Sequence, residues 1–287
     1  MVLVLWTLAM LTMLSGYYAV EARIRRNIGH NVLASIQGKN CVRAVLTMVA
    51  GNIAAPATDA SEAADASMTD GEPESSFRAD GTEYRMQFAG RDVRFRIEDE
   101  RGKLDLNKAS EDDIKTLMTI FLNDSERADL VSDSIMDWRD RDKLVRACGA
   151  EDETYEKKRP AYRAANGEFL LQQELLLVNG VSSDMFYGPV KWIGKGEEDA
   201  EWTGGLSDLV TIYNRSGKVV ANLAQPPLAA ALEESGKPGP ATAAGKGSVF
   251  RTVVYVDGLV YRIFWSPGGK RGNFTIHEWQ ESPEESA

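Results

Sequence analysis

Hydrophobic positions at the start of the chain form an uncharged run followed by a helical repeat. Residues 1–20 carry no charged side chain, and a helix of that length spans roughly 30 Å, the thickness of a bilayer core. From Ile24 to Val49, apolar residues recur at steps of three and four, which is typical of a helix with one buried face. The pattern predicts one helix over residues 1–50, its first part in lipid and its second part against a soluble domain.

The apolar run is expected to stay attached as an anchor. A cleaved signal peptide would need basic residues ahead of a shorter apolar stretch, and none precedes this one. The nearest basic residues, Arg23, Arg25 and Arg26, follow the run, and the positive-inside rule taken alone would keep that side in the cytoplasm.

Alternating patterns farther along the chain predict β-hairpins. Apolar side chains alternate with polar ones on both sides of the turn at residues 89–92. Near the C-terminus two apolar segments flank Asp257-Gly258, a dipeptide that suits a two-residue type I′ turn. The strands are expected at residues 84–88, 93–97, 250–256, 259–265 and 274–279.

A helical insert is expected between these two strand regions. Ser110 followed by Asp113 predicts a capping box at the start of a helix, and further helices are expected around residues 135–138 and over 169–178, the last ending at Asn179-Gly180. The resulting organisation is a helix, a linker with the first strands, the insert, and the remaining strands, at residues 1–50, 51–106, 107–195 and 196–287. Within the second part, residues 54–76 have almost nothing to bury and predict a linker.

Charge and composition argue against several functions. The net charge of −10 opposes binding to nucleic acid. The segments LNKASEDDI and LLLVNGV resemble pieces of helix-hairpin-helix DNA-binding proteins, but no basic residue accompanies the turn after Asn179. The histidines His30 and His277 have no triad or zinc pattern, and no nucleotide-binding loop occurs. Neither an enzyme, nor a small-molecule substrate, nor a nucleic-acid partner is expected.

The two cysteines cannot form a disulfide framework. Cys41 lies on the helical apolar pattern, where a buried free thiol is the simpler interpretation, and a bridge from Cys41 to Cys148 stays open.

Several separated segments, in order along nearly the whole chain, resemble one family. They are VLW (4–6), EDERGKLDLNKAS (98–110), DWRDRD (137–142), GAEDETY (149–155), ELLLVNGV (174–181) and IYNRSGKVVANLAQPP (212–227). In this order they are similar to the minor pseudopilin K of bacterial type II secretion systems.

The resemblance implies an α+β, pilin-like fold with a long N-terminal transmembrane helix, an antiparallel sheet and a large α-helical insert. It implies a structural role in protein export at the tip of the pseudopilus, with other minor pseudopilins as partners. It also implies a basic leader that prepilin peptidase removes. Such a leader would give an inner-membrane protein with a single span and a periplasmic domain, despite the arginines after the apolar run.

Acidic residues gather in the insert between positions 137 and 156. Carboxylate oxygens at this density suit Ca²⁺, which accepts six to eight oxygen ligands, although the spacing does not fit an EF-hand loop. The competing interpretation is a solvated acidic loop balanced by neighbouring Arg and Lys residues. The resemblance implies calcium bound within the insert, and the expected ligands are Asp140, Asp142, Glu151 and Asp152.

An alternative function stays open from the sequence. A protein with one membrane span and a ligand-binding or sensing outer domain would show the same anchor without assembling. Binding to other pilin-like proteins would favour the pseudopilin, and a monomer that binds a small molecule would favour the sensor.

Overall fold

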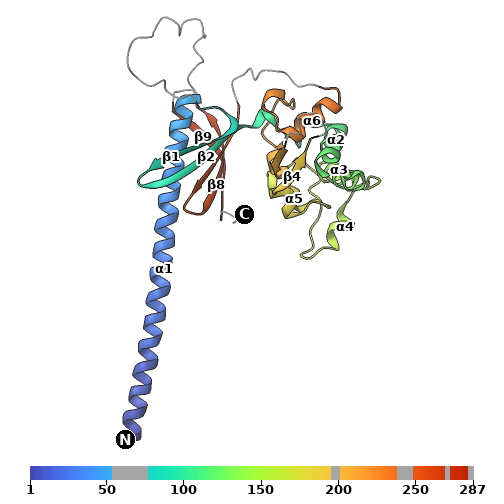
Figure 1. Ribbon diagram of the computed structural model, residues 1–287. Helices are drawn as coiled ribbons and strands as arrows, with labels where there is room; N and C mark the ends of the chain where they lie inside the picture. The colour runs from blue at the N-terminus through green and yellow to red at the C-terminus, as the bar shows by residue number, and fades with distance from the viewer. Residues whose placement is uncertain (54–76, 195–200, 238–247, 269–271, 284–287) are drawn as a thin grey trace, which may run out of the picture.

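The computed structural model describes residues 1–53, 77–194, 201–237, 248–268 and 272–283. The linker predicted at residues 54–76 lies outside these ranges. Figure 1 shows a long N-terminal helix, an antiparallel sheet packed along its far end and a helical unit beside the sheet. The predicted arrangement of long helix, sheet and helical insert is confirmed.

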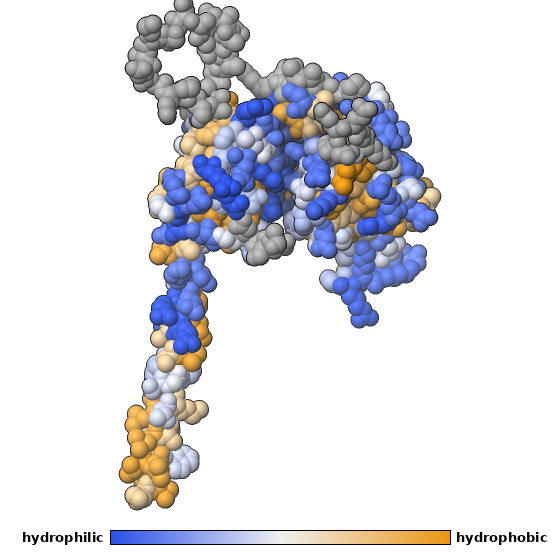
Figure 2. Space-filling view, viewed as in Figure 1, coloured by the Kyte–Doolittle hydropathy of each residue, from blue (hydrophilic) through white to orange (hydrophobic). Residues whose placement is uncertain are grey.

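Helix α1 (Val2–Ile53) is continuous, as predicted. Its first part is exposed and apolar, the orange lower end in Figure 2. Only its last turns are buried, where side chains such as Val42 and Leu46 pack against the sheet. A Cβ atom at Gly38 would lie 2.5 Å from the Tyr261 hydroxyl oxygen, so glycine is what allows helix and sheet to approach closely here.

The sheet is antiparallel and has the order β1-β2-β7-β8-β9. On the face toward α1, side chains such as Phe95, Val254 and Ile263 complete a core with the helix. Asp257 and Gly258 connect β7 to β8 with φ values of 53° and 73°, the positive angles that a type I′ turn requires. The strands are β1 (Asp80–Phe88), β2 (Arg91–Asp99), β7 (Phe250–Val256), β8 (Leu259–Pro267) and β9 (Phe274–Pro283).

The insert lies between β2 and β7, which are neighbours in the sheet. It extends beyond the predicted end at residue 195, because Leu206, Leu209 and Leu228 are part of its core. Its α-helices are α2 (Glu111–Leu122), α3 (Ser125–Arg139), α4 (Asp152–Glu156), α5 (Ser183–Tyr187) and α6 (Pro226–Glu234). Its strands are β3 (Leu104–Asp105), β4 (Val190–Ile193), β5 (Glu201–Gly204) and β6 (Val210–Thr211).

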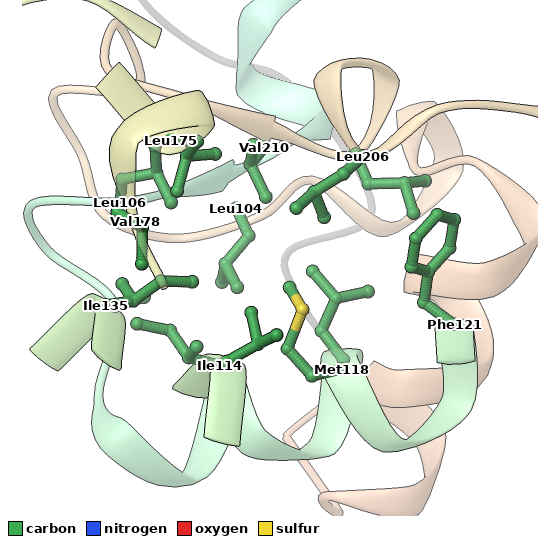
Figure 3. Packing of buried hydrophobic residues seen from close by; sticks show 14 of the residues in the cluster. Leu104, Leu106, Ile114, Met118, Phe121, Ile135, Leu175, Val178, Leu206 and Val210 are labelled. Atoms are coloured by element: carbon green, nitrogen blue, oxygen red, sulfur yellow. The ribbon is translucent and has the colours of Figure 1, made fainter. Parts of the chain in front are cut away.

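The insert has a hydrophobic core of its own, separate from that of α1 and the sheet. Helix α2 begins with the predicted capping box, in which Ser110 and Asp113 each accept a hydrogen bond from the other's backbone N–H. From that start, Ile114, Met118 and Phe121 lie on one helical face and point into the core (Figure 3). The insert therefore has the core of an independent unit.

The third predicted helix differs from the expectation. Residues 169–178 hold a short 3₁₀-helix, Gln172–Leu177, in place of an α-helix. The buried Gln172 side chain donates to the carbonyls of Ser207 and Val210, and the Glu174 carboxylate accepts from nearby backbone N–H groups. These side-chain contacts hold the segment in a tight turn against the core.

Candidate functional site

The uncovered face of α1 is the first candidate interaction surface. Within the described residues, α1 is the helix that is long and apolar enough to cross a membrane. Beyond residue 20 the helix still exposes apolar side chains, each at more than half of its surface, before it reaches the sheet. They are Ile24, Ile28, Val32, Leu33 and Ile36. A contiguous apolar surface of this kind is typical of a site covered by lipid or by another protein.

A buried cluster of charges joins the sheet to the insert. The Arg251 guanidinium, 1% exposed, bonds to the Glu98 carboxylate at 2.5 Å and to the Asp208 carboxylate at 2.5 Å. Lys103 Nζ lies 2.9 Å from Glu98 and 2.5 Å from Glu100. Because Glu98 and Arg251 come from β2 and β7 while Asp208 belongs to the insert, the cluster fixes how the two units sit relative to each other.

Glu98 and Asp208 stay ionised within this cluster. Burial alone would raise the pKa of Glu98, but Arg251, Lys103 and Arg96 lower it well below its usual range. Burial opposes ionisation of Asp208 in the same way, and Arg251 and Arg96 lower its pKa. The cluster therefore depends on its cations, and the two carboxylates would be costly to keep buried without them.

The four predicted calcium ligands fall into two pairs. Asp142 accepts a hydrogen bond from the Leu144 backbone N–H at 2.8 Å, and Asp152 pairs with Lys143 Nζ at 3.1 Å. Asp140 and Glu151 instead each have buried carboxylate oxygens without a hydrogen-bond partner among the described residues. The structure thus separates two engaged carboxylates from two unsatisfied ones.

Asp137 completes the unsatisfied group and is absent from the predicted ligand set. It is fully buried at the end of α3, and its Oδ1 atom has no hydrogen-bond partner among the described residues, although Arg146 Nε lies 3.4 Å away and the Arg146 backbone N–H donates to Oδ2. Burial raises the pKa of Glu151, and the charge of Asp137 raises that pKa further. Burial also raises the pKa of Asp137, and the charge of Asp140 adds to this effect. The three carboxylates therefore lie close enough to repel one another.

The carboxylate oxygens of these residues suit a hard cation, but the side chains do not form a complete coordination shell. Buried carboxylate oxygens without partners are costly, and a cation that binds oxygen would satisfy them. The residues that would hold it are Asp137, Asp140 and Glu151, and Ca²⁺ there would supply charge neutralisation that ties the end of α3 to the start of α4. Among the described residues, no three His, Cys, Asp or Glu side chains converge as a metal site.

The cysteines and histidines show no such convergence. Cys41 is buried and Cys148 exposed, and both are free thiols, so the structure does not form the bridge that the sequence left open. His277 Nε2 lies 2.9 Å from Ser266 Oγ on the sheet.

The helix, sheet and insert together define a pilin-like protein with an apolar N-terminal helix of membrane-spanning length. Residues 97–188 match the model of the family described as type II secretion system protein K. The resemblance to minor pseudopilin K is therefore confirmed.

A solved structure supports the same fold. The chain is similar to a chain in the crystal structure of the GspK-GspI-GspJ complex from the type 2 secretion system of enterotoxigenic Escherichia coli. The TM-score is 0.54 at 12% identity, and the match covers 93% of this chain and 100% of that one. At this identity the similarity establishes the fold. A comparison of the sequence with curated proteins finds no match.

Proposed function

We propose that this protein is a minor pseudopilin that acts by assembly, anchored in the inner membrane by α1 with its body in the periplasm. The uncovered apolar face of α1 carries this proposal, because side chains such as Ile28 and Ile36 lie beyond the span and are more than half exposed. Lipid would cover the first part of the helix, and helices of neighbouring subunits would cover this second part.

The partners we propose are other minor pseudopilins. The similar structure is titled as a complex of GspK with GspI and GspJ. By analogy, this chain would join subunits corresponding to GspI and GspJ at the tip of the pseudopilus. The insert adds a second unit beside the sheet, and this bulk favours a position at the end of a fibre over one within it.

Co-purification of the full chain with the other pseudopilins of its secretion system tests this proposal. Ile28→Asp with Ile36→Asp should abolish capture, because each places a charge in the proposed helix contact. Thr47→Asp is the control for each single change: it adds one negative charge, as Ile28→Asp or Ile36→Asp does, at an exposed position on α1 that already carries a polar side chain. Retained capture by the double variant would reject the assembly face. A monomer that binds a small molecule would favour the sensing alternative.

We also propose that the insert binds Ca²⁺ through Asp137, Asp140 and Glu151. The support is that each of these carboxylates has at least one buried oxygen without a hydrogen bond, although Arg146 lies near Asp137 and Asp140; Asp142 and Asp152 have no such oxygen. Calorimetry and thermal melting of the full chain with and without Ca²⁺ should show heat and a rise in Tm. Asp137→Asn should lose both responses, and Asp142→Asn should keep them. Loss of both responses in Asp142→Asn but not in Asp137→Asn would reject this ligand set in favour of the one expected from the sequence.

A further inference from the structure

Two basic segments stand out in a chain with a net charge of −10. The first is Arg23, Arg25 and Arg26, directly after the apolar run of α1. The second is residues 157–163, KKRPAYR, which hold four basic side chains and no acidic one. We call this second segment the basic loop. It follows α4 in the insert, far from α1 in the sequence.

The basic loop presents three of its four charges to solvent, while the half-buried Lys158 packs over the Tyr155 and Tyr162 rings. The side chains of Lys157 and Arg163 are 72% and 71% exposed, and they pair only with exposed glutamates of α4, at 2.8 and 2.9 Å. Arg159 is also exposed. Ion pairs at such exposed positions contribute little and exchange readily for a stronger anionic partner.

The basic loop faces the membrane end of the molecule. In Figure 1, α4 and the loop after it project from the insert toward the end at which α1 begins. Figure 2 shows that this projecting tip is strongly hydrophilic. The direction is fixed by packing, since α1 is held to the sheet around Gly38 and the sheet is held to the insert through Arg251.

We propose that the basic loop and the three arginines of α1 bind the headgroups of anionic phospholipids. The apolar run ends at Val20, so Arg23, Arg25 and Arg26 lie at the headgroup level when α1 spans the bilayer. A tilt of α1 toward the insert, of about the 20° common for membrane helices, lowers the basic loop toward the same surface. The subunit then contacts the membrane through two parts, the α1 anchor and the basic loop of the insert.

This inference rests on the membrane insertion of α1 but not on assembly with other pseudopilins. Surface attraction falls off within a Debye length, about 8 Å at physiological salt. Each basic residue near an anionic surface strengthens binding by about fivefold, so three in the loop shift the docked population by about a hundredfold. The effect is thus large enough to measure and sensitive to salt.

The test uses the full chain in nanodiscs that contain a headgroup-labelled acceptor lipid. A donor dye is placed at Ala161→Cys in a Cys148→Ser background, and energy transfer is measured in phosphatidylcholine with and without phosphatidylglycerol. Transfer should rise with phosphatidylglycerol and fall again in high salt. A dye at Glu234→Cys, at the end of α6, should report no change, because Figure 1 shows α6 on the side of the insert away from α4.

Charge variants decide whether the basic loop causes the effect. Lys157→Glu, Lys158→Glu and Arg159→Glu together should abolish the lipid dependence, and the corresponding glutamine changes should weaken it. The matched control reverses three exposed basic residues elsewhere, Arg215, Lys218 and Lys237, and should leave the lipid dependence intact. Equal transfer in neutral and anionic bilayers, or equal loss in test and control variants, would overturn the proposal. A chain that fails to enter nanodiscs of either composition would instead reject the anchor.

Discussion

Replacing Arg251 by Leu tests the buried charge cluster most directly. The change removes the guanidinium that bonds to Glu98 and Asp208 and leaves the Ser207 carbonyl without that donor. Removing one partner of a buried ion pair costs about 3–5 kcal/mol. Lys103 remains 2.9 Å from Glu98, which puts the expected loss near the lower end, about 3 kcal/mol.

The loss of unfolding free energy in Arg251→Leu should depend on pH, whereas the loss caused by a packing defect should not. In the wild type the cations lower the pKa of Glu98 and Asp208, so their stabilisation is present above the unfolded-state pKa of about 4 and is lost as pH falls through the native value. Arg251→Leu removes the largest of the effects that lower both pKa values, so both should rise although Lys103 and Arg96 remain. The free-energy difference between variant and wild type should therefore shrink as pH falls from 7 toward 4.

Urea unfolding of the full chain in detergent, followed by tryptophan fluorescence at several pH values, measures this difference. Arg85→Leu is the matched control, because Arg85 is 69% exposed and pairs with Glu83 on the surface. Its cost should stay below about 1 kcal/mol at every pH. A loss for Arg251→Leu as small as that of the control, or one that is constant with pH, would refute the reasoning.

Three further substitutions test other contacts. Gly38→Val should destabilise the body by about 1–3 kcal/mol in the same unfolding assay, because its Cβ meets the Tyr261 hydroxyl, whereas Gly29→Val, which has open space, should change stability little. Gly149→Ala should lower the Tm and weaken the Ca²⁺ response in calorimetry, because its Cβ would overlap the Asp137 carboxylate. Tyr213→Phe should cost about 1 kcal/mol in urea unfolding by removing the hydrogen bond to Glu278; no loss would show that this bond contributes nothing.

Local patterns were enough to predict several elements of this fold. The three- and four-residue repeat from Ile24 to Val49 predicted the course of α1, and the capping box at Ser110 predicted the start of α2. Asp257-Gly258 predicted the β7–β8 turn with its two positive φ angles. Each of these features depends on neighbours in the chain, which is why a sequence alone reveals it.

Contacts between distant segments were beyond the reach of those patterns. Nothing local indicates that Asp208 bonds to Arg251, so the extension of the insert past residue 195 was missed. Asp137 was also left out of the predicted ligand set. One signal was available: an acidic residue in the last turn of a helix opposes the helix dipole, so burying one there requires a compensating positive charge.

The placement of the insert between neighbouring strands has a consequence for folding. Residues 100–249 separate β2 from β7, although Asp99 and Phe250 pair directly. Closing a flexible loop of that length costs roughly 4–5 kcal/mol of chain entropy. An insert that has already folded around its own core holds its two ends close together and removes much of that cost. The sheet is therefore expected to close late, after the insert, so a defect in the insert would slow the folding of a sheet with which it shares no core.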